Sequence, residues 1–143
     1  MSIDARVLVT GVREPVELLG LMLGAAVHME NGKARVETSA LTVVAWVASD
    51  HGYSRELYGI SPSVIAHVLF HKESLSEGTR EFRSAIRRLL QHMSGEIVVI
   101  SHDDVILKRL EGERVVHRRY VDLLPDAERS VWNVSDLIPV PEE

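Results

Sequence analysis

The amino-acid sequence predicts an α+β fold, in which a mainly antiparallel sheet packs against two helices. Apolar residues recur at helical spacing in only two segments, and the other apolar runs are short and rich in β-branched residues. Several of these runs are separated by two or three residues, a connection that joins antiparallel neighbours. The predicted order is β-α-β-β-β-α-β-β-β, with a short hairpin counted as one β unit. At 143 residues the chain has the length of a single domain.

Short apolar runs predict the strands, and the residues between them predict the turns. In the run 63–71, apolar residues alternate with others at period two, as expected for a strand with one buried face. Asn31-Gly32 is a strong signal for a two-residue hairpin and predicts a strand on either side. Residues 102–104 and 111–113 separate three further runs. The predicted strands are 6–10, 26–30, 33–38, 41–48, 63–71, 96–101, 105–110 and 114–120.

The two helices are predicted from their apolar stripes and their ends. The first begins at Pro15, which suits the first turn of a helix because an N–H would have no partner there. Gly20 and Gly24 lower the propensity of this helix and would let another backbone come close. The second helix is capped by Ser76 and ends at Gly95. Its apolar residues share one face: Phe82, Ile86, Leu89, Leu90 and Met93.

Residues 49–59 are predicted as a polar loop, and Trp46, in the strand before them, is assigned to the core. Residues 122–143 contain three prolines but retain apolar residues, so we expect them to pack across the single domain formed by 1–143. This segment holds six acidic residues and one arginine, which account for the whole net charge of −5. The rest of the chain is neutral and is not expected to hold nucleic acid by bulk electrostatics. The acidic segment would suit a basic protein partner.

The composition excludes several classes of protein. The chain has no cysteine, which removes disulfides, thiolate metal sites and cysteine nucleophiles. No uninterrupted apolar stretch approaches the roughly 18 residues of a membrane span. The first six residues lack the cationic start of a signal peptide. We therefore expect a cytoplasmic protein that does not enter membranes.

No catalytic motif stands out. The sequence has no Gly-x-Ser-x-Gly elbow, no phosphate loop with Gly-Lys-Ser/Thr, and no acid pair in an apolar setting. His67 and His71 are four apart, but on a strand they would lie about 13 Å from each other, too far for one metal ion. Arg80, Arg83 and Arg87 are interpreted as a solvated helix face, paired with nearby glutamates. We predict no enzyme, no cofactor and no metal site.

From Ser61 onward the sequence has a distinctive succession of segments. Ser-Pro-Ser-Val-Ile-Ala-His-Val-Leu-Phe leads through Lys72 into the amphipathic helix, followed by Ser-Gly-Glu-Ile-Val-Val-Ile, Val-Ile-Leu-Lys-Arg, a Glu-Gly-Glu turn and a strand running into Leu-Leu-Pro. Over residues 61–125 this succession resembles the Sit-type (swarming-inhibition) immunity proteins, and more loosely the immunity proteins of bacterial polymorphic-toxin systems. Such proteins are made beside a secreted toxin and neutralise it by binding in the producing cell. The resemblance transfers no functional residue, because these families bind through variable surfaces.

We expect a non-catalytic binding protein, and specifically an immunity protein that binds a toxin domain directly. The side chains expected to contact a basic partner lie in the acidic segment and in the turn at 102–104: Asp103, Asp104, Asp122, Asp126, Glu128, Trp132 and Asp136. Tryptophan is included because it is over-represented among the residues that dominate interfaces. Two alternatives stay open. One is a small-molecule-binding module or cryptic enzyme with a pocket between the sheet and the first helix, and the other is a structural or regulatory homo-oligomer.

Overall fold

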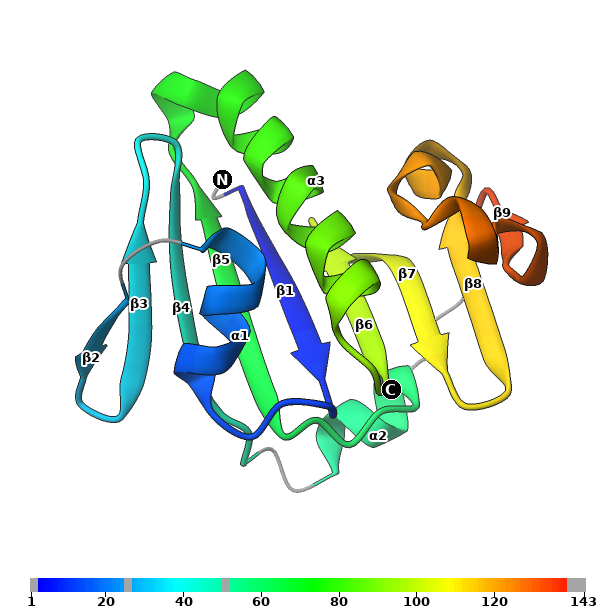
Figure 1. The fold of residues 1–143 in the computed structure, drawn as a ribbon, viewed down its shortest axis with the longest axis horizontal. Coiled ribbons are helices and arrows are strands. Elements are labelled where there is room, and N and C mark those ends of the chain that lie inside the picture. The colour runs from blue at the N-terminus through cyan, green and yellow to red at the C-terminus, as the bar shows by residue number, and fades with distance from the viewer. Residues whose placement is uncertain (1–2, 25–26, 50–51, 139–143) are drawn as a thin grey trace.

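The computed structural model describes residues 3–24, 27–49 and 52–138, which form one mainly antiparallel sheet with helices (Figure 1). The strand order is β2-β3-β4-β5-β1-β6-β7-β8-β9, and the β8–β9 pair is parallel. The strands are β1 (Asp4–Val9), β2 (His28–Glu30), β3 (Lys33–Glu37), β4 (Leu41–Val47), β5 (Val64–Phe70), β6 (Ile97–Ser101), β7 (Asp104–Leu110), β8 (Glu113–His117) and β9 (Asn133–Ser135). The helices are α1 (Pro15–Leu23), α2 (Tyr53–Tyr58) and α3 (Leu75–His92), with 3₁₀ segments η1 (Lys72–Ser74), η2 (Arg118–Leu123) and η3 (Asp126–Val131). The predicted α+β class is confirmed.

One face of the sheet carries the main hydrophobic core. Helices α1 and α3 lie side by side on this face (Figure 1). Leu18 and Leu19 of α1, and Ile86 and Leu89 of α3, are fully buried there. Strand β5 contributes every second residue to this core, as its alternation predicts. The sheet and these two helices therefore form two packed layers.

The opposite face of the sheet is covered over its centre. A second apolar cluster forms there, in which Tyr58 and Ile60, at and after the end of α2, and Ile138 of the C-terminal segment pack with Leu8 and Val98. Further along this face, strands β3, β4 and β5 have half-buried or exposed side chains. They include Lys33, Arg35, Glu37, Val44, Trp46, Ile65, His67 and Leu69.

Two expectations about residues 41–59 were wrong. The segment predicted as a loop contains α2, a third helix, which lies between Gly52 and Gly59, both with positive φ (98° and 78°). A six-residue helix is too short to give an apolar period that could be recognised. Trp46 is not in the core, because β4 alternates and turns Leu41 and Val43 toward the helices. Trp46 lies on the other face, half-buried beside Ile65.

The ends of two elements also differ from the prediction. Strand β8 stops at His117, and residues 118–123 form a 3₁₀ turn instead of continuing the strand to Tyr120. Helix α3 begins at Leu75, so Ser76 lies inside its first turn and does not cap it. Boundaries of this kind depend on tertiary packing as well as on local sequence.

The glycines of the first helix play a different role from the one predicted. A Cβ on Gly20 would meet no atom of a described residue within 4 Å, so no described backbone approaches there, and Gly24 ends α1 in the left-handed conformation (φ 61°). The close backbone approach lies elsewhere. A Cβ on Gly11 would lie 1.9 Å from the Ser94 carbonyl oxygen, and Gly95 packs against Gly11 with φ 102°.

Part of the predicted strand 26–30 falls outside the described residues, and β2 covers 28–30. The end of the acidic segment, 139–143, also lies outside them. Within the described part of the chain, no helix has both the length and the apolar character that a membrane span requires.

Candidate functional site

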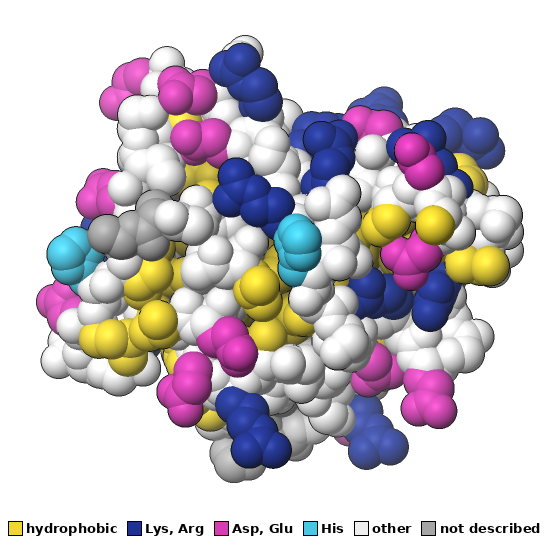
Figure 2. Space-filling model, in the orientation of Figure 1, with side chains coloured by type: hydrophobic (Ala, Val, Ile, Leu, Met, Phe, Trp, Pro, Cys, Tyr) yellow, Lys and Arg dark blue, Asp and Glu magenta, His cyan; other side chains and the backbone are white. Residues whose placement is uncertain are grey.

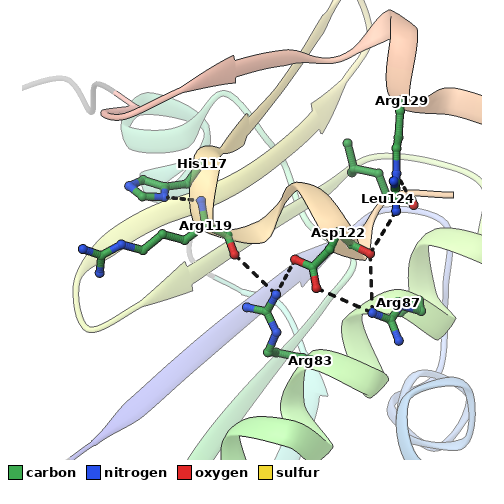
Figure 3. A network of polar contacts seen from close by, with 7 residues as sticks. All are labelled: Arg83, Arg87, His117, Arg119, Asp122, Leu124 and Arg129. Atoms are coloured by element: carbon green, nitrogen blue, oxygen red, sulfur yellow. Dashed lines mark hydrogen bonds and ion pairs between the residues drawn. The ribbon is translucent and has the colours of Figure 1, made fainter. Parts of the chain in front are cut away.

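Asp122 joins the C-terminal segment to helix α3 (Figure 3). Its carboxylate accepts a hydrogen bond from the Arg83 guanidinium, and its Oδ2 atom lies 3.8 Å from Nη2 of Arg87. Its backbone carbonyl accepts from Arg87 at 3.4 Å and from Arg129 at 3.5 Å. The hydrogen bond from Arg83 lowers the pKa of Asp122, so this carboxylate is charged at neutral pH. Arg83 and Arg87 therefore hold the C-terminal segment and are not a solvated face paired with glutamates. Glu81 and Glu77 of α3 instead accept hydrogen bonds from hydroxyls in the loop before β4.

The other acidic side chains expected to contact a partner from the C-terminal segment are also paired within the chain. The ion pairs are Asp126–Arg129 at 3.3 Å, Glu128–Arg114 at 3.4 Å and Asp136–Arg118 at 2.8 Å. On the molecular face drawn in Figure 2, acidic and basic side chains are accordingly interspersed rather than segregated by sign. The four acids in the described part of this segment therefore do not form a separate acidic surface.

Trp132 belongs to the main core and is 5% exposed. Its indole nitrogen is buried and makes no hydrogen bond with a described residue. Leu123 and Leu124, in the same segment, are buried as well. The indole anchors the C-terminal segment to its own domain and is not presented to a partner.

Asp103 and Asp104 differ from the acids of the C-terminal segment. Both are exposed in the hairpin between β6 and β7, and neither makes an ion pair with a described residue. The hairpin is closed by the pair Ser101 and Asp104, which leaves His102 and Asp103 as its two turn residues. Both turn residues have positive φ, 53° and 70°. The backbone N–H of His102 donates to the carbonyl of Asp4 at 3.1 Å.

The chain contains a second two-residue turn with nearly the same backbone. In the β2–β3 hairpin, Asn31 has φ 52° and Gly32 has φ 78°. Asn-Gly is the preferred sequence for such a turn, because a left-handed conformation costs a residue with a Cβ about 1–2 kcal/mol. His and Asp tolerate this conformation better than most residues but less well than glycine. The β6–β7 turn therefore presents two polar side chains where glycine would give the more stable backbone.

A cavity of about 230 Å³ lies beside this turn, and we call it the turn–tail pocket. It is lined by the turn, β7, the end of β8 and the C-terminal segment: Ser101, His102, Asp104, Val105, Ile106, His117, Arg119, Tyr120, Asp136, Leu137 and Ile138. Val105, Ile106 and Ile138 are buried, so the pocket is apolar inside and polar at its rim. Leu137 is 75% exposed.

The polar groups around the turn–tail pocket have spare hydrogen-bonding capacity. The Arg119 guanidinium makes no hydrogen bond or ion pair with a described residue, although its backbone N–H donates to His117 Nδ1 at 3.1 Å. The His117 ring packs edge-on against Tyr120, with ring centres 6.0 Å apart. In Figure 3 the side chains of His117 and Arg119 extend away from the Asp122 network. The pocket thus offers both donors and acceptors to a ligand.

The turn–tail pocket brings together part of the predicted site. Asp104 and Asp136, 32 residues apart in the sequence, line the same cavity, and Asp103 is in the adjoining turn. Asp122, Asp126, Glu128 and Trp132 do not line it. The sequence interpretation missed His102, His117, Arg119 and Tyr120 as pocket residues. One feature of the sequence could have pointed to the turn: His102-Asp103 connects two strands as a two-residue loop, but it lacks the glycine that such loops usually contain.

Two other candidate sites are occupied by the chain's own groups. The interface between α1 and the sheet is filled by Leu18, Leu19 and Met22, where a ligand pocket had been an open alternative. A depression of about 550 Å³ beside the end of α3 is lined by Arg109, but its guanidinium donates to the Leu90, Met93 and Gly95 carbonyls at 2.6–3.2 Å. Burial lowers the pKa of Arg109.

Within residues 3–24, 27–49 and 52–138, no three His, Asp or Glu side chains lie close enough together to hold a metal ion. His67 and His71 have separate partners, Asp4 Oδ2 and Thr42 Oγ1, each at 2.8 Å. Comparisons of the chain with protein-family models, curated proteins and solved structures give no match. The chemistry of the turn–tail pocket is therefore the basis for assigning a function.

Proposed function

We propose that this chain is a binding protein of the immunity type, which neutralises a toxin domain by direct contact, and that the turn–tail pocket is the centre of that contact. The observation that supports the pocket is the His102-Asp103 turn, which keeps polar side chains at left-handed positions where glycine would be more stable. The observation that supports an immunity role is the resemblance over residues 61–125. Binding would take place in the cytoplasm of the producing cell.

A basic partner fits the two carboxylates that the described part of the chain leaves unpaired in the turn, and the Arg119 guanidinium in the same pocket can bind an acidic group of that partner. Asp103 and Asp104 are exposed without an ion pair to a described residue, whereas the described acids of the C-terminal segment are held by arginines. An unpaired carboxylate can accept from a partner's arginine or lysine without first breaking an internal pair. Leu137 supplies an exposed apolar contact beside them, and a polar rim around an apolar centre is the usual anatomy of an interface.

The experiment is calorimetric titration of this chain with the protein encoded by the neighbouring gene, at low and at high salt. We expect binding that weakens at high salt, because unpaired surface charges raise the association rate only when they are not screened. The double substitution Asp103→Asn/Asp104→Asn should weaken binding about tenfold or more, which is about 1.4 kcal/mol. Asp126→Asn is the matched control, because it removes an exposed acid that lies outside the pocket and should leave affinity within about twofold. Absence of binding at low salt would rule the proposal out.

A further inference from the structure

A second cavity, which we call the Arg6 pocket, lies on the face of the sheet opposite α1 and α3 and has a different chemistry. Its volume is about 230 Å³, and it is lined by Arg6, Leu8, Trp46, Ser49, Tyr53, Ser54 and Ile65. Trp46, Ile65 and Leu8 are direct neighbours across β4, β5 and β1, so three adjacent strands form its floor. Tyr53 of α2 contributes a second aromatic ring and is 50% exposed.

Arg6 is the only charged side chain that lines this cavity in the described part of the chain. It is half-buried, and one of its guanidinium nitrogens donates to the Tyr58 hydroxyl at 3.3 Å. It makes no ion pair with a described acid. The nearest acid on its own strand, Asp4, is bound to His67 at 2.8 Å. Arginine has five N–H donors, so one long hydrogen bond leaves the guanidinium free to bind an anion.

We propose that the Arg6 pocket binds a carboxylate attached to a flat apolar group. The carboxylate would take two hydrogen bonds from Arg6, and the apolar group would lie on Leu8 and Ile65 beside the Trp46 ring. Arg6 forms no ion pair with a described acid and lies at the edge of an aromatic and aliphatic cavity, so the pocket provides both halves of such recognition. Lys33, whose Nζ lies 5.7 Å from the Trp46 ring centre, adds positive charge next to the indole. This proposal does not depend on the proposed toxin partner.

The carboxylate could belong to a small molecule or to the C-terminus of a polypeptide, and the test separates the two. The full-length protein is titrated with phenylacetate and, separately, with its neutral analogue 2-phenylacetamide, while the indole N–H signals are followed by ¹H–¹⁵N NMR. With about ten non-hydrogen atoms, phenylacetate should bind with a Kd of about 1 mM. The Trp46 signal should move, and that of Trp132, which is buried in the other cluster, should stay in place.

Two variants and two peptides complete the test. Arg6→Gln should weaken phenylacetate binding about tenfold, whereas Arg35→Gln, an exposed arginine of β3 outside the cavity, should leave it unchanged. A dipeptide ending in Phe with a free carboxylate is compared with its C-terminal amide. Tighter binding of the dipeptide acid than of phenylacetate assigns the site to a polypeptide end, and binding of phenylacetate alone assigns it to a small molecule. Equal shifts with phenylacetate and 2-phenylacetamide, or no shift of the Trp46 signal with either, would overturn the proposal.

Discussion

The β6–β7 turn can be rebuilt with the sequence that the chain uses in its other turn of the same kind. In the double variant His102→Asn/Asp103→Gly, the backbone keeps its geometry but the left-handed positions are filled as they are in Asn31-Gly32. Glycine at position 103 relieves backbone strain, which stabilises the fold by about 1–2 kcal/mol. This gain is offset by about 0.5–1 kcal/mol, because glycine loses more conformational entropy on folding than aspartate does. The net expectation is a gain of about 1 kcal/mol in the free energy of unfolding.

Urea denaturation followed by circular dichroism measures this gain as a higher midpoint at an unchanged m-value. For a domain of this length, about 1 kcal/mol corresponds to an increase of about 3 °C in Tm. The reciprocal variant, Asn31→His/Gly32→Asp, is the matched control. Among the described residues, no atom lies within 4 Å of a Cβ built on Gly32, so this variant should lose about 1 kcal/mol for backbone reasons alone.

The same double variant separates stability from binding. It should bind the protein encoded by the neighbouring gene less tightly than the wild-type chain does, because His102 and Asp103 no longer face the partner. A more stable protein with weaker binding is the trade-off typical of a functional turn. If the variant is less stable than wild type while the reciprocal variant behaves as expected, the His102 and Asp103 side chains stabilise the fold themselves, and the reasoning is refuted.

Three further predictions concern the contacts that hold the domain together. Asp122→Asn should remove a pH-dependent part of the stability, because the pKa of Asp122 is lower in the folded protein than in the unfolded chain. The contribution of Asp122 is complete above its ordinary pKa of about 4 and is lost as the pH falls through the lower, folded pKa. Urea midpoints of variant and wild type should therefore converge in acid, and a constant difference would contradict the ion pairs with α3. Arg109→Met should lower the free energy of unfolding by about 2–3 kcal/mol, because it leaves carbonyls at the end of α3 without a donor. Arg109→Lys should restore only part of this loss. An unchanged urea midpoint for Arg109→Met would show that water replaces the guanidinium. Gly11→Ala should lower the free energy of unfolding by more than about 2 kcal/mol, whereas Gly20→Ala should stabilise α1 by about 0.5–1 kcal/mol. Equal effects of the two substitutions in thermal denaturation would contradict the close approach of the Ser94 carbonyl to Gly11.

The parts of the fold that were predicted correctly have local causes. The alternation in 64–70 follows from the period of a strand, and the Asn31-Gly32 hairpin follows from the φ values that glycine and asparagine accept. The apolar stripe of α3 follows in the same way from the helical period. Each of these patterns is contained in fewer than about 20 residues, so the sequence alone reveals it.

The parts that were missed depend on residues far apart in the chain. The sheet order places β1 between β5 and β6, and no local pattern in 4–9 specifies those neighbours. The acidic segment was predicted from its net charge to face a partner, but Asp122 binds arginines that lie 39 and 35 residues earlier in the sequence. Trp46 was assigned to the core because its strand is apolar throughout, and the structure leaves that side of β4 without a covering layer among the described residues. Pairing and layer coverage are tertiary properties, which composition does not determine.

The most direct test of the turn–tail pocket is hydrogen–deuterium exchange of the full chain, measured with and without the protein encoded by the neighbouring gene. We expect binding to slow amide exchange in three segments that are separate in sequence and adjoin in the structure: 101–105, 117–120 and 136–138. Exchange in α1, none of whose residues lines the pocket, should stay unchanged. Protection confined to α1 and α3, or no protection in the presence of the neighbouring protein, would contradict the assignment of this pocket as the binding site.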